Sequence, residues 1–162
     1  MDKNKLFNDY LVTNLDLAYR FAFTFVKNEK DAEDIVSDSV LKALKSINRL
    51  KKPQHLKTWF YKIIANTAFT HLKKKSKLYF IENNKMDTLC ESNDDYSHIT
   101  IQSIVSLLDE NHRVVIVLRF LEDMKIKEIS EVLNINENTV KTRLYSALKL
   151  LKISLEDKHE GF

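Results

Sequence analysis

A segment near the C-terminal end combines hydrogen-bond donors with positive charge and has no acidic residue between Asn138 and Leu155. If Val140 faces inward, a helix that turns about 100° per residue presents several polar side chains outward or on its flanks. They are Asn138, Lys141, Thr142, Arg143, Tyr145, Ser146 and Lys149. Amide and hydroxyl groups can hydrogen-bond to base edges, and Lys and Arg bind phosphates. The segment therefore predicts a surface that reads nucleic acid.

The residues before this segment supply a turn that could aim it. A short helix is expected from Lys125 to Leu133, and Asn134 can end it because Asn tolerates a positive φ better than other non-glycine residues. Asn136 can then cap the next helix, with Thr139 three residues on. A short helix followed by a tight turn and a second helix is the arrangement of a helix-turn-helix motif. The alternative is a solvated helix in an ordinary helical bundle.

A second acid-free block runs from Lys42 to Ile81 and is rich in lysine. A helix is expected within it, from about Leu56 to Lys75. The face opposite its apolar stripe carries Lys62, Asn66, Phe69, Lys73 and Lys77. An amide, an aromatic ring and several cations can follow the backbone of a single strand and engage an unstacked base. One such block is usually just a solvated face, but two of them favour two contacts with a polyanion.

The composition predicts an all-α protein. The sequence has one Gly and one Pro, Gly161 and Pro53, whereas hairpin sheets and doubly wound folds need glycine in tight turns and phosphate loops. Helical periodicity runs through residues 1–77, is lost over 78–97 and returns over 98–155. We therefore expect two small helical domains, 1–77 and 98–155, joined by a flexible linker at 78–97.

Apolar residues at helical spacing are expected to form the two cores. The first helix offers Leu6, Phe7, Tyr10, Leu11, Leu15, Phe21, Phe23 and Phe25. The second helix offers Ala32, Ile35, Val36, Val40, Ala43, Leu44 and Ile47, and the third offers Leu56, Phe60, Ile63, Ile64 and Thr67. The second domain offers Ile101, Ile104, Val105, Leu108, Val114, Val117, Leu118, Leu121, Ile126, Ile129, Val132, Leu133, Val140, Leu144, Ala147, Leu148 and Leu151. Between the first two helices, Asn28 is expected in the left-handed conformation and Asp31 as the next cap.

Several classes of function lack support in the sequence. It has no Gly-rich phosphate loop and no triad-like motif, and its His residues do not pair with Cys or carboxylates at metal-ligand spacing. We therefore expect no enzyme activity, no cofactor and no metal site. No window reaches the roughly 18 consecutive apolar residues of a membrane span, so no direct membrane insertion is expected. The lone Cys90 fits a reducing cytosol and a cytoplasmic location.

The C-terminal segment "KIKEISEVLNINENTVKTRLYSALKLLK" resembles region 4 of bacterial sigma factors of the extracytoplasmic-function (ECF) type. The family pattern is roughly E-I-A…L-G…G-T-V-K-S-R-L. The matching residues are Glu128, Ile129, Leu133, Thr139, Val140, Lys141, Arg143 and Leu144. The resemblance implies that the second helix reads the −35 promoter element and that this domain also meets the β flap of RNA polymerase.

The first domain resembles region 2 of the same family. In "DAEDIVSDSVLKALKSI", the residues Ala32, Glu33 and Asp34 match region 2.2, although Ser37 and Val40 replace the usual Gln and Phe. The resemblance implies that this helix binds the clamp helices of the polymerase β′ subunit. The contacts are expected on its face opposite the core, at Asp34, Asp38 and Leu41.

The segment "LKTWFYKIIANTAFTHLKKKSK" resembles regions 2.3 and 2.4 through Trp59, Tyr61, Ile63 and Asn66. The loop around Pro53 resembles the family loop that receives a flipped base of the −10 element. Trp59 and Tyr61 are expected to be core or boundary aromatics. The expected −10 contacts are Arg49, Lys51, Lys52, Lys62, Asn66, Phe69, Lys73 and Lys74.

The resemblance covers about residues 3–77 and 98–153, in family order. It implies an alternative sigma factor that binds core RNA polymerase and promoter DNA and is held by an anti-sigma factor. Two other hypotheses stay open from the residues alone. One is a stand-alone helix-turn-helix regulator that does not act through core polymerase. The other is a helical interaction protein whose basic faces are only solvated.

Overall fold

The computed structural model describes residues 1–82, 105 and 107–159. These residues form helices and include no strand, so the all-α prediction is confirmed. The helices are α1 (Lys3–Val26), α2 (Glu29–Ser46), α3 (Leu56–Glu82), α5 (Glu110–Ile116), α6 (Ile126–Leu133) and α7 (Glu137–His159). Short turns of 3-10 helix, η1 (Ile47–Arg49) and η2 (Pro53–His55), and a π-helical turn, η3 (Val117–Leu121), complete them. Most of the predicted linker, including Cys90, lies outside the described residues. Ile101 and Ile104, which the sequence predicts in the second core, lie outside them as well.

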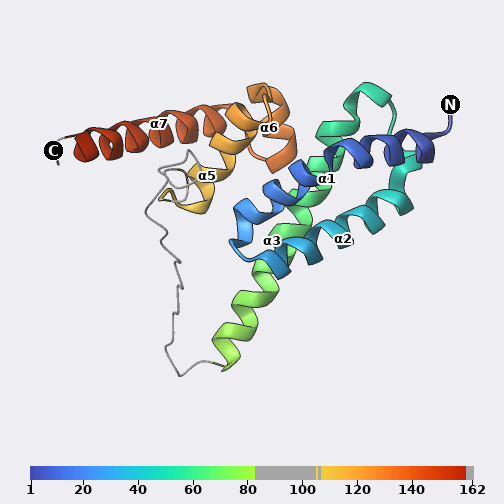
Figure 1. The fold of residues 1–162 in the computed structure, drawn as a ribbon, viewed down its shortest axis with the longest axis horizontal. Helices are drawn as coiled ribbons and strands as arrows, with labels where there is room; N and C mark the ends of the chain where they lie inside the picture. The colour runs from blue at the N-terminus through green and yellow to red at the C-terminus, as the bar shows by residue number, and fades with distance from the viewer. Residues whose placement is uncertain (83–104, 106, 160–162) are drawn as a thin grey trace.

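The first three helices pack against one another as one unit (Figure 1). Its core is aromatic. The ring of Phe7 meets that of Phe60 edge to face, with 5.1 Å between centroids, and the ring of Phe21 lies 4.8 Å from that of Tyr61. All four side chains are almost fully buried. Aromatic burial of this kind supplies most of the driving force for packing a small helical unit, which explains why α1 needs so many Phe residues.

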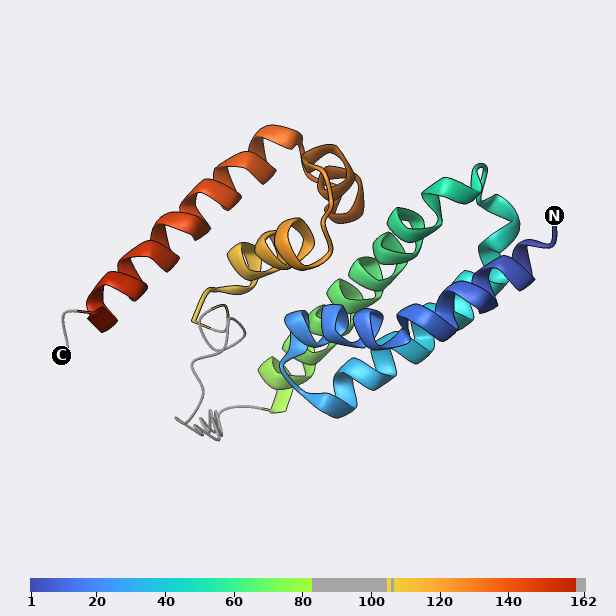
Figure 2. The same ribbon diagram turned by 45° about the horizontal axis from the view of Figure 1, so that its top comes forward.

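The second unit consists of α5, η3, α6 and α7. The N-terminal part of α7 packs on α5 and α6 through Val140, Leu144 and Ala147, which are buried. Its C-terminal part projects away from the rest of the molecule in both Figure 1 and Figure 2. The two units also touch each other, because α3 packs against α6 and α1 packs against α5.

The junction between α1 and α2 differs from the prediction by one residue. Lys27, not Asn28, takes the left-handed conformation with φ of 50°, and its N–H donates to Phe23 O. The side chain of Asn28 instead accepts a hydrogen bond from the N–H of Asp31 at 3.0 Å. Asn28 thereby serves as the helix cap, a role in which a side-chain oxygen satisfies a free N–H. The expectation that Asp31 caps α2 is wrong for the same reason.

Five residues expected in the cores are exposed: Leu15, Phe23, Leu44, Leu121 and Leu148. The first three lie on the outer sides of α1 and α2, and Leu148 lies on the projecting part of α7. Leu121 has a local cause. In η3 the N–H of Glu122 bonds to Val117 O, five residues back. This wider turn inserts one extra residue into the helical repeat, so the apolar stripe shifts and Glu122 points inward instead of Leu121.

Candidate nucleic-acid interface

The turn before α7 has the geometry that its two Asn residues predict. Asn134 is left-handed, with φ of 54° and ψ of 46°. The side-chain oxygen of Asn136 accepts a hydrogen bond from the N–H of Thr139 at 2.9 Å. Behind the turn, the Ser130 hydroxyl donates to Ile135 O at 2.6 Å. Local hydrogen bonds thus fix the angle between α6 and α7, as a helix-turn-helix requires.

One long face of α7 is solvent-exposed and free of acid. Opposite the buried Val140, Leu144 and Ala147, the side chains of Asn138, Lys141, Thr142, Tyr145 and Lys149 are exposed, and those of Arg143 and Ser146 are half-buried on the flanks. The Thr142 hydroxyl donates to Asn138 O at 2.9 Å, so its oxygen remains free to accept. The face can therefore offer cations to phosphates and polar groups to base edges.

The predicted face of α3 is exposed as well. Lys62, Asn66, Lys73 and Lys74 are in solvent, whereas Phe69 keeps one ring edge against Phe25, with 5.3 Å between centroids. Phe69 is 39% exposed, so part of its ring remains available for a base. Trp59 is half-buried and Tyr61 is buried, which confirms both as boundary or core aromatics. The helix runs to Glu82, past its expected end near Lys75.

The loop before α3 forms a basic cleft with its helix. A cavity of about 510 Å³ is lined on this side by Arg49, Lys51, Lys52, Trp59 and Lys62, among others. The amine of Lys3 holds the loop in place by donating to Leu50 O at 2.8 Å and to Asn48 O at 3.2 Å. Sequence reasoning missed Lys3. Nothing in the local pattern distinguishes a lysine that ties down a distant loop from one in solvent.

The acidic face of α2 points outward. Asp34, Asp38 and Leu41 are all exposed, and Leu41 shows 56% of its surface to solvent. Nearby, Asp31 accepts a hydrogen bond from Lys75 Nζ at 2.8 Å, and its other oxygen lies 3.5 Å from His71 Nε2. The hydrogen bond from Lys75 holds the pKa of Asp31 below its ordinary value, with His71 adding to the effect. This cluster fixes α2 to α3, so it fixes the acidic face relative to the basic one.

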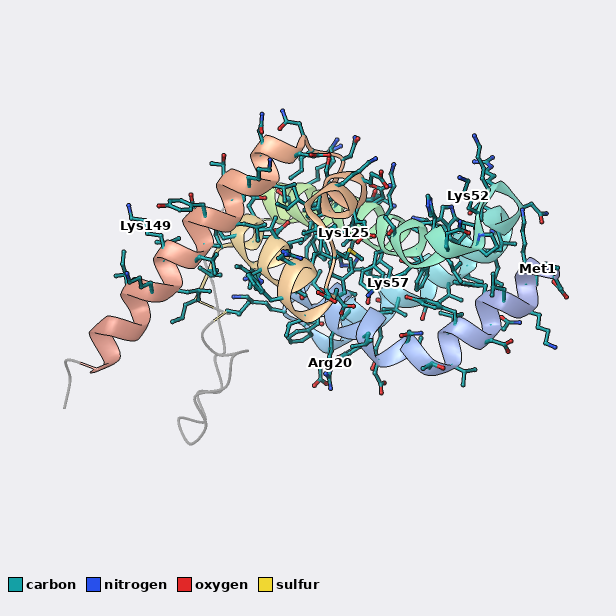
Figure 3. The ribbon with its side chains drawn as sticks, turned by 90° about the horizontal axis from the view of Figure 1, so that it is seen from above. Met1, Arg20, Lys52, Lys57, Lys125 and Lys149 are labelled. Atoms are coloured by element: carbon teal, nitrogen blue, oxygen red, sulfur yellow. The ribbon has the colours of Figure 1, made fainter. Side chains whose placement is uncertain are left out.

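The predicted DNA surfaces lie on different units. Lys149 on α7 and Lys52 in the loop before α3 lie far apart along the long axis of the molecule (Figure 3). Phe69 and Arg143 nevertheless line one smaller cavity, of about 190 Å³, where the units meet. The described part of the chain holds no cluster of three or more His, Cys, Asp or Glu side chains arranged for a metal ion. Among the described helices, none combines the length and apolar composition needed to span a bilayer.

Comparison with known proteins identifies the family. A family model described as Sigma-70 region 2 matches residues 11–78, and one described as Sigma-70, region 4 matches residues 98–151. RNA polymerase sigma factor SigV of Bacillus subtilis (strain 168) is 42% identical over 138 residues, which cover 85% of this chain and 83% of that protein. The chain belongs to the sigma-70 family of RNA polymerase sigma factors. ECF RNA polymerase sigma factor SigW of the same organism is 28% identical over 93% of this chain and 89% of its own length.

This ECF-type sigma factor also shares its fold with solved structures. Its chain superposes on the sigma factor RpoE of Bartonella quintana, solved in complex with the anti-sigma factor NepR, with a TM-score of 0.78 and 19% identity over 93% of this chain and 96% of that one. CnrH, solved in complex with the cytosolic domain of CnrY, gives a TM-score of 0.64 and 20% identity over 93% and 88% of the two chains. The protein is therefore an alternative sigma factor that acts with core RNA polymerase to direct transcription initiation at promoter DNA.

Proposed function

We propose that this sigma factor reads its promoter with two separate faces. The exposed face of α7, at Asn138, Lys141, Thr142, Arg143, Tyr145, Ser146 and Lys149, binds the −35 element in the major groove. The observation that carries this assignment is the acid-free, solvent-facing side of α7, aimed by the left-handed Asn134 and the Asn136 cap. A helix presented in this way is the usual major-groove reader.

The first unit, residues 1–77, is proposed to bind the −10 element. Arg49, Lys51 and Lys52 of the loop, with Lys62, Asn66, Phe69, Lys73 and Lys74 of α3, bind the strand that becomes single as the duplex opens. The cations neutralise phosphates, and the exposed part of the Phe69 ring offers a stacking surface. Capturing an unpaired base offsets the few kcal/mol that unstacking requires. The second unit is residues 98–155, and residues 78–97 link the two units, with 78–82 forming the end of α3.

The acidic face of α2 is the proposed docking surface for core polymerase. Asp34 and Asp38 present negative charge beside the exposed Leu41, a combination suited to the clamp helices of the β′ subunit. The second unit contacts the β flap. The chain itself catalyses no reaction and needs no cofactor, because the polymerase does the chemistry, and it works in the cytoplasm. An anti-sigma protein is its proposed inhibitor, as NepR is the partner of the fold relative RpoE.

Run-off transcription tests these assignments. Purified core polymerase is mixed with the wild-type chain and with genomic fragments, and start sites are mapped. Once a promoter is found, templates with altered −35 or −10 bases are compared. Lys141→Ala should reduce use of the −35 element and Lys62→Ala should slow opening at −10. Selective initiation that ignores both faces would contradict the residue assignments, whereas duplex binding without any complex with core enzyme would favour the stand-alone regulator.

A further inference from the structure

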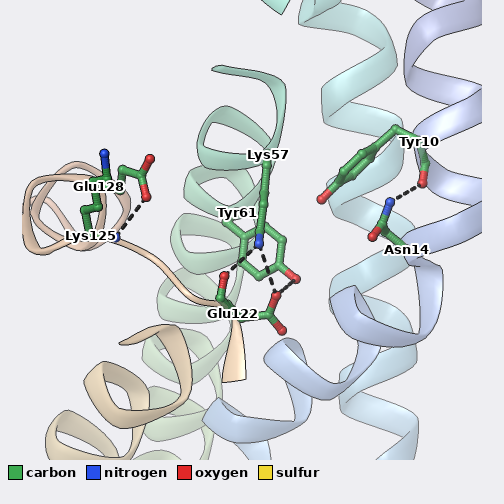
Figure 4. Close-up of polar contacts among 7 residues, drawn as sticks. All are labelled: Tyr10, Asn14, Lys57, Tyr61, Glu122, Lys125 and Glu128. Carbon is green, nitrogen blue, oxygen red and sulfur yellow. Dashed lines mark hydrogen bonds and ion pairs between the residues drawn. The ribbon is translucent and has the colours of Figure 1, made fainter. Parts of the chain in front are cut away.

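A buried carboxylate joins the two units. The side chain of Glu122 is 3% exposed and belongs to the second unit, directly after η3. The hydroxyl of Tyr61, on α3 of the first unit, donates to Glu122 Oε2 at 2.8 Å. The amine of Lys57, one turn earlier on α3, lies 3.8 Å from the same oxygen and donates to Glu122 O at 2.7 Å. Figure 4 shows the contacts that Lys57 and Tyr61 make with Glu122.

The chemistry of this contact favours a stable hydrogen bond between the two units. Burial raises the pKa of the Tyr61 hydroxyl, and the nearby Glu122 adds to the rise, so Tyr61 remains a donor throughout the neutral range. A hydrogen bond in a buried site of low dielectric is electrostatically stronger than the same bond in water. Tyr61 and Lys57, which contact the side chain of Glu122, both lie in the other unit. Its carboxylate therefore contributes to holding the units together.

Arg113 makes a second joint on the other side of the interface. Its guanidinium is buried, donating through Nε to Thr24 O at 2.7 Å and through Nη1 to Leu108 O at 3.0 Å. Thr24 lies in the last turn of α1, where carbonyl groups lack helical partners and a cation is favoured. One side chain of the second unit thus caps a helix of the first.

The closed arrangement covers part of the proposed −10 face. The basic cleft that contains Lys52 and Lys62 is closed on its far side by Lys125, Lys127 and Glu131 of the second unit. In the smaller cavity, Phe69 lies opposite Val114, Leu133 and Arg143. In this position the second unit narrows the access of a single strand to the loop and to the part of α3 at Lys62, although the α3 face beyond it is exposed.

The distance between the two promoter elements is a second reason why the packed units could not bind both of them. The −35 and −10 elements are centred about 25 base pairs apart, and at about 3.4 Å per base pair they lie about 85 Å apart on straight DNA. In this structure α3 and α6 are in direct contact. The two units cannot remain packed in this way and also occupy both elements.

We propose that Glu122 and Arg113 form an interdomain latch, which keeps the free sigma factor closed and must open before the −10 and −35 elements can be bound together. The latch is an autoinhibitory contact. It rests on the proposed assignment of the two DNA faces, but the closure itself is measurable without DNA.

Distance measurement on the free protein tests the latch. Spin labels at Ser37→Cys on α2 and Lys152→Cys on α7, two exposed positions, are introduced in a Cys90→Ser background. The wild-type chain should give one narrow distance distribution by double electron–electron resonance. Glu122→Lys places a second cation against Lys57 and should shift most of the population to longer, broader distances. Glu137→Lys makes the same charge change at an exposed position in the first turn of α7, away from both cavities between the units, and should leave the narrow distribution intact.

A charge swap separates latch opening from simple unfolding. Lys57→Glu combined with Glu122→Lys restores an ion pair and should recover the short distance, which a misfolded second unit could not do. Glu122→Lys should also raise the affinity of the free protein for single-stranded −10 DNA about tenfold or more, because closure no longer competes with binding. A broad distribution in the wild type, or an unchanged one in Glu122→Lys, would overturn the latch. Opening without any gain in DNA affinity would leave the latch standing and count against the −10 assignment.

Discussion

The side-chain oxygen of Asn136 accepts a hydrogen bond from the backbone N–H of Thr139 at 2.9 Å. Two residues earlier in the chain, Asn134 is in the left-handed conformation. The two Asn residues have different structural roles. Asn134 lets the chain leave α6 without a glycine, and Asn136 satisfies an N–H that would lack a partner in the first turn of α7. The position of the proposed −35 reader therefore depends on two short polar side chains.

Replacing the cap should cost stability without unfolding the protein. Asn136→Ala removes the acceptor for Thr139 N–H, and we expect the free energy of unfolding to fall by about 1 kcal/mol. Asn136→Asp keeps an oxygen at the same place and should change it by much less. Urea denaturation followed by circular dichroism measures both. Equal destabilisation by Ala and Asp would show that the hydrogen bond to Thr139 is not what the position supplies.

The Asp31 cluster should make stability depend on pH. The hydrogen bond from Lys75 and the proximity of His71 lower the pKa of Asp31 from its ordinary value of 3.8. Because folding lowers this pKa, ionised Asp31 stabilises the fold above that value, and the contribution is lost as pH falls through the lower, folded pKa. Asp31→Asn should cost about 0.5 kcal/mol at pH 7, since Lys75 is largely exposed. The difference from wild type should shrink toward zero between about pH 4 and pH 2.

The control for this experiment is Asp9→Asn, which removes the same charge from an exposed position on α1. Its difference from wild type should be small at every pH. If Asp31→Asn loses stability by the same amount at pH 7 and at pH 2.5, the ionised contact between α2 and α3 is not the cause.

Much of the fold follows from local patterns in the sequence. The stripe of α2, the end of α6 at Asn134 and the exposed face of α7 depend on residues close together in the chain, so helical periodicity and turn chemistry predict them. The exposed positions of Asp38, Lys62 and Tyr145 follow in the same way. Each is opposite an apolar stripe that has to be buried.

The errors arise where the outcome depends on distant parts of the chain or on an irregular turn. Glu122 is buried because η3 adds a residue to the helical repeat and because Tyr61 and Lys57 of another unit meet it there. Arg113 is buried because it reaches the end of α1. Neither partner can be inferred from the neighbouring sequence. A regular helical wheel does not include the extra residue of η3, so it predicts Leu121 in the core. In the structure Leu121 is 53% exposed.

The face of α7 should contribute to DNA binding through charge. If Lys141 contacts a phosphate, Lys141→Ala should weaken binding of the holoenzyme to promoter DNA and reduce the slope of log K against log salt by about 0.9. Lys5→Ala removes the same charge from an exposed position of α1, outside the proposed DNA faces, and should leave the slope unchanged. Filter binding at several salt concentrations measures both. A weaker complex with an unchanged slope would indicate that Lys141 contacts a base or only supports the helix.

The acidic face of α2 should control assembly with polymerase. Asp38 and Leu41 are exposed and lie one helical turn apart, so a partner helix can contact both at once. Asp38→Lys reverses a charge in the proposed contact and should weaken binding to core enzyme about tenfold or more, mainly through faster dissociation. The free energy of unfolding should change by less than about 0.5 kcal/mol, because the side chain is in solvent. Titration of labelled sigma factor with core polymerase measures the affinity.

Asp9→Lys provides the matched control, since it makes the same charge reversal at an exposed position on α1. Only the α2 variant should lose affinity, and Leu41→Ala should add to the loss because it removes the apolar part of the contact. If Asp38→Lys and Asp9→Lys bind core enzyme as tightly as wild type, the docking surface is not on this face of α2. If both lose affinity equally, the polymerase responds to overall charge, and no specific contact at Asp38 is required.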